Sequence, residues 1–112
     1  AFQMHVLAVT AVRYEAGALV GLSLGRADAA TRDWIVPPKG VPVLEVVDHL
    51  ADSEQVATLF PAGDGQLAPG PNLQIIVLAN GAESVETEGA PEGRCVADLP
   101  RLSYNPGPSS LP

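Results

Sequence analysis

The sequence has a single cysteine, five aromatic residues and no apolar run long enough to cross a membrane. A lone Cys95 excludes a disulfide framework, and a membrane-spanning helix needs ~20 consecutive apolar residues. The hydrophobic fraction of 46% is too high for a wholly disordered chain, because such chains lack the apolar surface that offsets ordering entropy. The 112 residues therefore predict one small soluble domain with a core of Val, Leu and Ala.

Basic residues are absent from the middle of the chain. Residues 41–93 hold nine acidic residues and no Lys or Arg, and the whole chain has a formal net charge of -7. Nucleic acid and anionic membranes both bind through clustered Lys and Arg, so we expect neither as a direct partner. A basic protein surface is compatible with this charge, although acidic residues also simply keep small proteins dispersed.

The start of the chain has no features of a secretory leader. Met4 follows Ala1-Phe2-Gln3, and we expect Ala1–Gln3 to be a cloning remnant. With no leader and no paired cysteine, we expect a cytoplasmic protein. Frequent Ala, Val, Gly and Pro beside one Lys indicate a bacterium or phage with a GC-rich genome.

Alternating apolar residues predict strands in the first third of the chain. His5–Tyr14 is apolar on both faces, which indicates a central strand. It is joined by Glu15-Ala16-Gly17 to a second strand over Leu19–Leu24, the pattern of a hairpin. A short strand over Trp34–Val36 should end at Pro37-Pro38, because proline cannot donate to a sheet ladder.

The middle of the chain predicts one helix, over Pro42–Ala51. Val43, Val46, Val47 and Leu50 recur at helical spacing, with acidic residues on the opposite side. The alternative is a strand through Val43–Val47, which the β-branched valines favour.

Three further strands are predicted at Gln55–Phe60, Leu73–Ala79 and Glu83–Glu88. Residues 61–71 contain three glycines and three prolines, which predicts a loop. Asn80-Gly81 joins the last two strands and favours the positive φ angles of a tight type I′ turn.

These elements predict an α+β fold: a small, curved antiparallel sheet or partial barrel of five to six strands with one covering helix. An all-β barrel is the alternative if Val43–Val47 is extended. The domain spans residues 1–88. Residues 89–112 form a proline-rich C-terminal extension, which Val96, Leu99, Leu102 and Tyr104 can anchor against its own domain or a second subunit. Within it, residues 99–102 could add to a sheet edge or lie in a groove.

Groups that perform chemistry do not gather in the sequence. His5, His49 and Cys95 are too dispersed for a zinc site, and we expect no catalytic, metal-binding or cofactor-binding residues. His49 and Ser53 would share one face of the helix, but the adjacent Asp48 points elsewhere and cannot orient the imidazole. An adjacent Arg94 could lower the pKa of Cys95, although a plain structural or incidental cysteine is the expected interpretation.

The glycine-rich loop also lacks a ligand-binding pattern. No Lys-Ser/Thr follows its glycines, as a phosphate-binding loop requires. Asp64-Gly65 is not part of the carboxylate series of a calcium loop. The loop therefore predicts a connection between strands.

Trp34 is the only tryptophan. It should either fill the core or line a binding surface with Pro37 and Pro38. The candidate partner-binding residues are large apolar or acidic side chains on predicted edges and in the extension: Trp34, Glu83, Glu86, Glu88, Leu99, Leu102 and Tyr104.

We therefore expect a non-enzymatic protein–protein interaction or assembly module. It would bind a protein partner or a second copy of itself, as a homodimer or larger homo-oligomer, through sheet edges and a docking C-terminal tail. One alternative is an acidic inhibitor that occupies a basic groove of a nucleic-acid-handling protein. Another is a small enzyme with a pocket at a subunit interface, in which Glu45, Asp48 and His49 would act.

Overall fold

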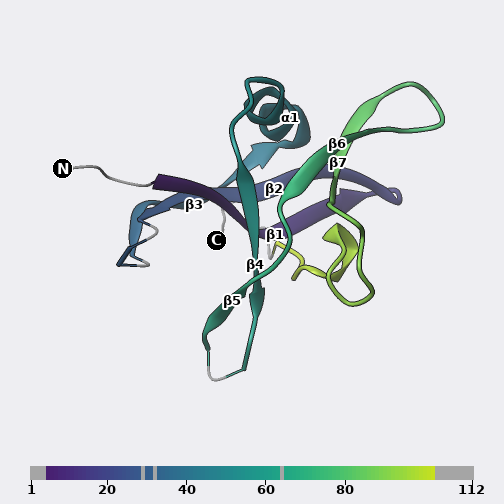
Figure 1. Cartoon of the computed structure of the whole chain (residues 1–112). Helices are drawn as coiled ribbons and strands as arrows, with labels where there is room; N and C mark the ends of the chain where they lie inside the picture. Colours follow the sequence, from purple (N-terminus) through teal and green to yellow (C-terminus); the bar gives the residue numbers. More distant parts are fainter. Residues whose placement is uncertain (1–4, 29, 32, 64, 103–112) are drawn as a thin grey trace, which may run out of the picture.

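The computed structural model describes residues 5–28, 30–31, 33–63 and 65–102. They form a five-stranded sheet, a separate two-stranded hairpin and one α-helix (Figure 1). The elements in chain order are β1 (His5–Glu15), β2 (Ala18–Asp28), β3 (Trp34–Pro42), α1 (Val43–Ala51), β4 (Val56–Pro61), β5 (Leu67–Pro69), β6 (Leu73–Val77), β7 (Glu83–Thr87) and the 3₁₀ turn η1 (Val96–Asp98). The α+β class with one helix is confirmed.

The large sheet is mixed, with strand order β3-β2-β1-β4-β5. β1 is central, as predicted, but its pairing with β4 is parallel, so the prediction of an antiparallel sheet is wrong at this pair. Parallel neighbours need a long crossover connection. Between β1 and β4 this connection consists of β2, β3 and α1. The sheet is not closed into a barrel, and among the described strands β6 pairs with β7 alone, so the alternative of an all-β barrel is wrong.

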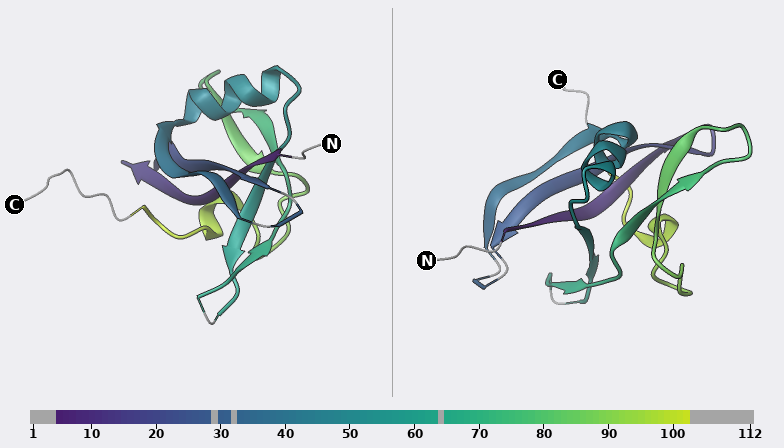
Figure 2. Two further views of the ribbon diagram at one scale, coloured as in Figure 1. Left: turned by 90° about the vertical axis from the view of Figure 1, so that its left-hand side faces the viewer. Right: turned by 45° about the horizontal axis from the view of Figure 1, so that its top comes forward.

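The predicted helix is confirmed as α1, with Pro42 as its N-cap. Val46 and Val47 are buried against the sheet, while Glu45 and Asp48 are exposed. Packing of this apolar face outweighs the β preference of valine, and the strand alternative for residues 43–47 is wrong. Figure 2 shows α1 covering one face of the sheet.

The third strand continues through Pro37 and Pro38 to Pro42, so the prediction that it ends at Val36 is wrong. β3 lies at the edge of the sheet, where a missing backbone donor can face away from the neighbouring strand. The register with β2 shifts between Leu24 and Arg26, so the two prolines lie in an irregular stretch opposite Gly25.

The predicted loop over residues 61–71 contains a short strand, β5, which pairs with β4. Its three residues are too few for an alternating pattern to be visible in the sequence. The Asn80-Gly81 turn also differs from the prediction. The amide of Leu78 donates to Ala82 O (2.8 Å), the amide of Gly81 donates to Leu78 O (2.9 Å), and only Gly81 has a positive φ (88°). This pattern matches a three-residue loop with a glycine bulge.

The core lies between the α1 side of the sheet, the helix, the β6–β7 hairpin and the C-terminal segment. Its buried members include Val9, Leu22, Val46, Val85 and Leu99. No helix in the described ranges is long and apolar enough to span a bilayer.

Residues 96–102 pack onto their own domain. Val96 and Leu99 are buried in the core, and residues next to Arg101 pair with β1. The amide of Val12 donates to Pro100 O (2.9 Å), and the amide of Leu102 donates to Val12 O (2.7 Å). This segment therefore extends the sheet beside β1, at a point that β4 does not reach.

Candidate binding face

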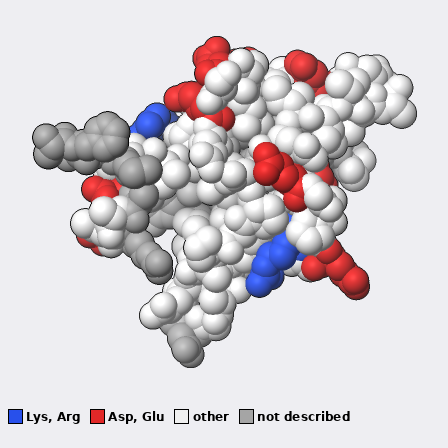
Figure 3. All heavy atoms as spheres, viewed as in Figure 1, with Lys and Arg blue, Asp and Glu red and all other residues white. Residues whose placement is uncertain are grey.

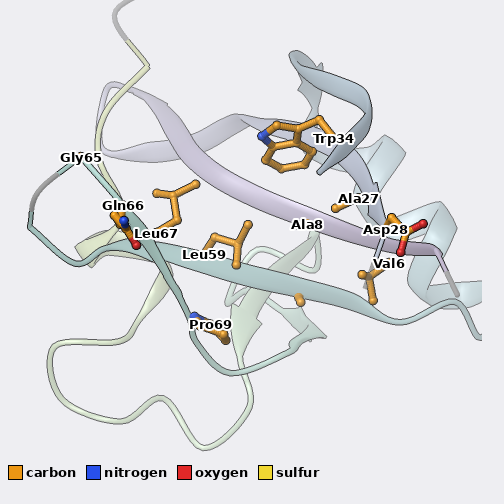
Figure 4. Close-up of a pocket in the computed structure, with 11 residues that line it drawn as sticks. Val6, Ala8, Ala27, Asp28, Trp34, Leu59, Gly65, Gln66, Leu67 and Pro69 are labelled. Carbon is orange, nitrogen blue, oxygen red and sulfur yellow. The ribbon is translucent and has the colours of Figure 1, made fainter. Parts of the chain in front are cut away.

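The face of the sheet opposite α1 contains a cavity of about 550 Å³. It arises from strand alternation: Leu7 and Val9 point into the core, while Val6 and Ala8 line the cavity. The lining residues come from all five strands and the β4–β5 loop: Val6, Ala8, Ala27, Asp28, Trp34, Ala57, Leu59, Gly65, Gln66, Leu67 and Pro69. Figure 4 shows Trp34, Leu59 and Leu67 around this space.

Small residues make the floor of the cavity. Ala8 is paired with Gly25 on β2 and with Ala57 on β4, so one row across three strands carries almost no side-chain volume. Trp34 lies at the end of this row, with ring atom Cζ3 2.7 Å from the position that a Cβ on Gly25 would occupy. Glycine at position 25 therefore allows the indole to lie directly against β2.

Trp34 is half-buried and is not a member of the core cluster. The expectation that it fills the core is therefore wrong. It lines the cavity with residues of β1, β4 and β5 rather than with Pro37 and Pro38. A half-buried indole on an apolar face that no described helix or strand covers has contact area available to a ligand.

Few polar side chains reach the cavity. Asp28 Oδ1 accepts hydrogen bonds from the amides of Ala30 (2.8 Å) and Thr31 (3.2 Å), so this carboxylate stabilises the β2–β3 connection. Gln66 is the other lining residue with a polar side chain besides Trp34. The cavity is therefore suited to recognising an apolar shape and has little with which to perform catalysis.

The suspected enzymatic residues lie elsewhere, on α1. His49 Nδ1 is bonded to Glu54 Oε1, and Asp48 is exposed. Ser53 lies beyond the end of the helix with φ 67°, so the predicted shared helical face of His49 and Ser53 is wrong. Among the described residues, no group of three His, Cys, Asp or Glu side chains could hold a metal ion.

A second cavity of about 240 Å³ lies between α1 and the β2–β3 edge. Glu45 and His49 line it with Arg26 and Lys39. These four side chains mix both charge signs at an open position.

The candidate glutamates on β7 and directly after it have different environments. Glu83 and Glu88 are exposed, but Glu86 Oε2 accepts hydrogen bonds from the amides of Val96 (2.7 Å) and Thr87 (2.9 Å). Glu86 therefore fixes the start of η1. On the side shown in Figure 3, acidic side chains form separate groups on a largely uncharged surface, which does not favour one continuous acidic face.

The candidate residues of the C-terminal segment lie partly inside the molecule. Leu99 is buried and Leu102 is half-buried beside β1, while Tyr104 lies outside the described residues. The guanidinium of Arg101 lies 4.6 Å from the centroid of the Tyr14 ring. Burial raises the pKa of Tyr14, and the positive charge of Arg101 opposes that rise.

The pKa of Cys95 is raised, contrary to the lowering that Arg94 suggested. Desolvation raises it first, and the carboxylates of Glu86 and Asp98 add to the effect. Arg94 is directed elsewhere, with its guanidinium 4.9 Å from the centroid of the Phe60 ring. The thiol is thus less reactive than an ordinary exposed cysteine at neutral pH.

No protein-family model, curated protein or solved structure matches the chain.

Most residues of the cavity were not among the sequence candidates; only Trp34 was. The signal was nevertheless present, because β1 is apolar on both faces. One face packs under α1, and the other forms the cavity floor.

Proposed function

We propose that this protein is a non-enzymatic protein–protein interaction module whose concave sheet face receives an apolar segment of a partner. The observation that carries the proposal is the cavity of about 550 Å³ across β1, β4 and β5, with Trp34 on its wall. Its volume lies within the range of about 300–1,000 Å³ that is typical of ligand sites.

The chemistry of the lining supports a binding role. Leu59, Leu67 and Trp34 offer apolar contacts, and tryptophan is among the residues that contribute most to interface affinity. Each partner Leu, Val or Phe side chain buried there contributes about 1.5–3 kcal/mol. Association also costs entropy. Two such anchors therefore stabilise a complex only if the partner segment already has a defined conformation before it binds.

A displayed library of random peptides tests this proposal. We expect immobilised protein to enrich peptides with two or more large apolar residues. Because Trp34 is the only tryptophan, its fluorescence emission should shift when a selected peptide binds. Trp34→Ala should abolish capture of the selected peptides.

Leu44→Ala is the matched control, because Leu44 is an exposed apolar residue on α1, away from the cavity. It should leave capture unchanged. The proposal is wrong if Trp34→Ala retains the peptides while unfolding at the wild-type temperature, or if no apolar motif is enriched.

A further inference from the structure

The two ends of the cavity opposite α1 differ in chemistry. At the β4–β5 end, Leu59, Leu67 and Pro69 supply apolar lining, and at the β2–β3 end the lining holds Asp28 and the indole of Trp34. Of the described residues that line the cavity, Asp28 alone is charged. Figure 4 shows Asp28 on one side of this space and Leu67 on the other. The cavity therefore has one apolar end and one end that is acidic and aromatic.

Strand pairing fixes the carboxylate and the indole as neighbours. Ala27 of β2 lies directly opposite Trp34 of β3, and Asp28 follows Ala27 in the chain. The amide of Asp28 donates to Asp33 O (2.9 Å), on the residue before Trp34. Opposite residues of antiparallel strands have Cα atoms only about 4.5–5.5 Å apart, so the two side chains lie at the same end of the β2–β3 ladder.

The β2–β3 connection needs an oxygen atom of Asp28 but not its charge. Oδ1 accepts both amide hydrogen bonds from this connection, and the oxygen of an asparagine side chain can accept the same bonds. Asp28 takes part in neither of the ion pairs formed among the described residues, Arg13–Glu15 and His49–Glu54. A half-buried negative charge therefore remains available to a ligand in the cavity.

We propose that the partner segment, on whose binding this inference rests, carries an arginine whose guanidinium lies between Trp34 and Asp28. A cation above an aromatic ring is attracted by the π electrons, and tryptophan is the best ring for this contact. The carboxylate adds a charge-assisted hydrogen bond. Arginine suits both groups because its guanidinium is planar, stacks on aromatic rings and donates several hydrogen bonds.

A neutral or acidic residue fits this end of the cavity less well. It would cover the carboxylate of Asp28 without replacing the water that solvates it, and a buried charge without a partner costs free energy. The chain as a whole has a net charge of -7, and such a field speeds the approach of a basic segment and repels an acidic one. The local geometry and the overall charge thus favour the same partner.

The strand order sets the spacing within the partner segment. Neighbouring strands follow the order β2-β1-β4-β5 across the cavity, so Leu67 on β5 and Asp28 on β2 are separated by three strand spacings, about 14 Å. An extended chain covers about 3.3–3.6 Å per residue. The arginine should therefore lie about four residues from the apolar anchor that contacts β5.

The displayed peptide library gives the first test. Enriched peptides should contain an arginine at this spacing from a large apolar residue. Enrichment of apolar peptides with no preference for a basic residue overturns this inference and leaves the proposed function standing. A library with no enriched motif overturns both.

A double-mutant cycle then locates the contact. An enriched peptide is synthesised with arginine and with glutamine at the basic position, and each form is titrated against each protein variant by the fluorescence of Trp34. The change to glutamine should cost about tenfold in affinity for the wild type, as loss of a hydrogen bond to a charged group does. Asp28→Asn, which keeps an acceptor for the two amides, should bind both peptides alike.

Asp48→Asn is the matched control, because it makes the same change at an exposed aspartate on α1, outside the cavity lining. It should retain the full difference between the peptides. Equal differences in Asp28→Asn and the wild type refute the inference. Arg32 lies outside the described residues, and Arg32→Gln should also retain the difference; its loss in that variant would equally refute the contact with Asp28.

Two further measurements test the indole and the occupant. Trp34→Leu keeps an apolar side chain without a π face, so calorimetry should show a larger loss for the arginine peptide than for the glutamine peptide; equal losses would place the arginine away from the indole. Wild-type protein alone should sediment at 11.6 kDa. A dimer that Trp34→Ala dissociates would mean that a second copy occupies the cavity, and the proposal would be wrong.

Discussion

Leu99→Ala tests whether the C-terminal segment belongs to the cooperative fold. Leu99 is 2% exposed and lies in the core cluster. The substitution removes three carbons, which lowers the free energy of unfolding by about 2.4 kcal/mol at about 0.8 kcal/mol per buried carbon. The cavity left behind adds to this loss, and the total for buried Leu→Ala changes is about 2–5 kcal/mol.

Thermal and urea unfolding followed by circular dichroism measure the effect. A loss of about 3 kcal/mol lowers Tm by about 12–24 °C in a domain of this size. Leu44→Ala makes the same change at a leucine that is 57% exposed, and it should change the free energy of unfolding by no more than about 0.5 kcal/mol. The reasoning is refuted if the two variants unfold alike, since residues 96–102 would then contribute nothing to the core.

Two further substitutions test local packing and charge. Gly25→Ala places a Cβ 2.7 Å from a Trp34 ring atom and 2.9 Å from backbone atoms of β3, so we expect the free energy of unfolding, measured by denaturant titration, to fall by about 1–3 kcal/mol. Gly40→Ala, whose Cβ would meet its nearest atom at 4.0 Å, should be tolerated, and equal losses would contradict the predicted clash. Glu86→Gln removes a carboxylate that raises the pKa of Cys95, so the midpoint of the pH profile for thiol alkylation should fall; an unchanged or higher midpoint would show that this charge does not act on the thiol.

Hydrophobic periodicity predicted where most secondary structure lies but not how it pairs. The strands at residues 5–15 and 73–77 and the helix at residues 43–51 appear where the pattern indicated. The period of the hydrophobic pattern indicates which residues share a face of a helix or strand. It does not indicate which strands lie side by side in the sheet. The parallel partnership of β1 with β4 was therefore not visible in the sequence.

Proline was overinterpreted in the sequence. Pro37 and Pro38 were expected to end a strand, and the many prolines after residue 89 indicated an extension without a core of its own. In an edge strand, however, a missing donor costs little. Beyond residue 89, Val96 and Leu99 are buried in the core of the preceding domain, and sequence spacing alone cannot reveal such long-range packing.

The candidate cavity could not be predicted from the sequence, because its floor depends on the register between neighbouring strands. Gly25, Ala8 and Ala57 come from three separate strands and become one row only when the register is known. Trp34 was singled out because it is the only residue of its kind. Trp34 is paired with Ala27 of β2 beyond two register shifts, and spacing along the chain does not indicate such a pairing.

The pairing of Val12 with residues 100–102 has a consequence for synthesis of the chain. A ribosome makes β1 before residues 100–102, so part of its edge acquires a hydrogen-bonding partner only when nearly the whole described chain has emerged. At about 5–20 residues per second, that backbone waits for several seconds with open donors and acceptors. Chaperones or neighbouring nascent chains can reach it during this interval, so translation speed should influence how much of the protein is recovered in its native form.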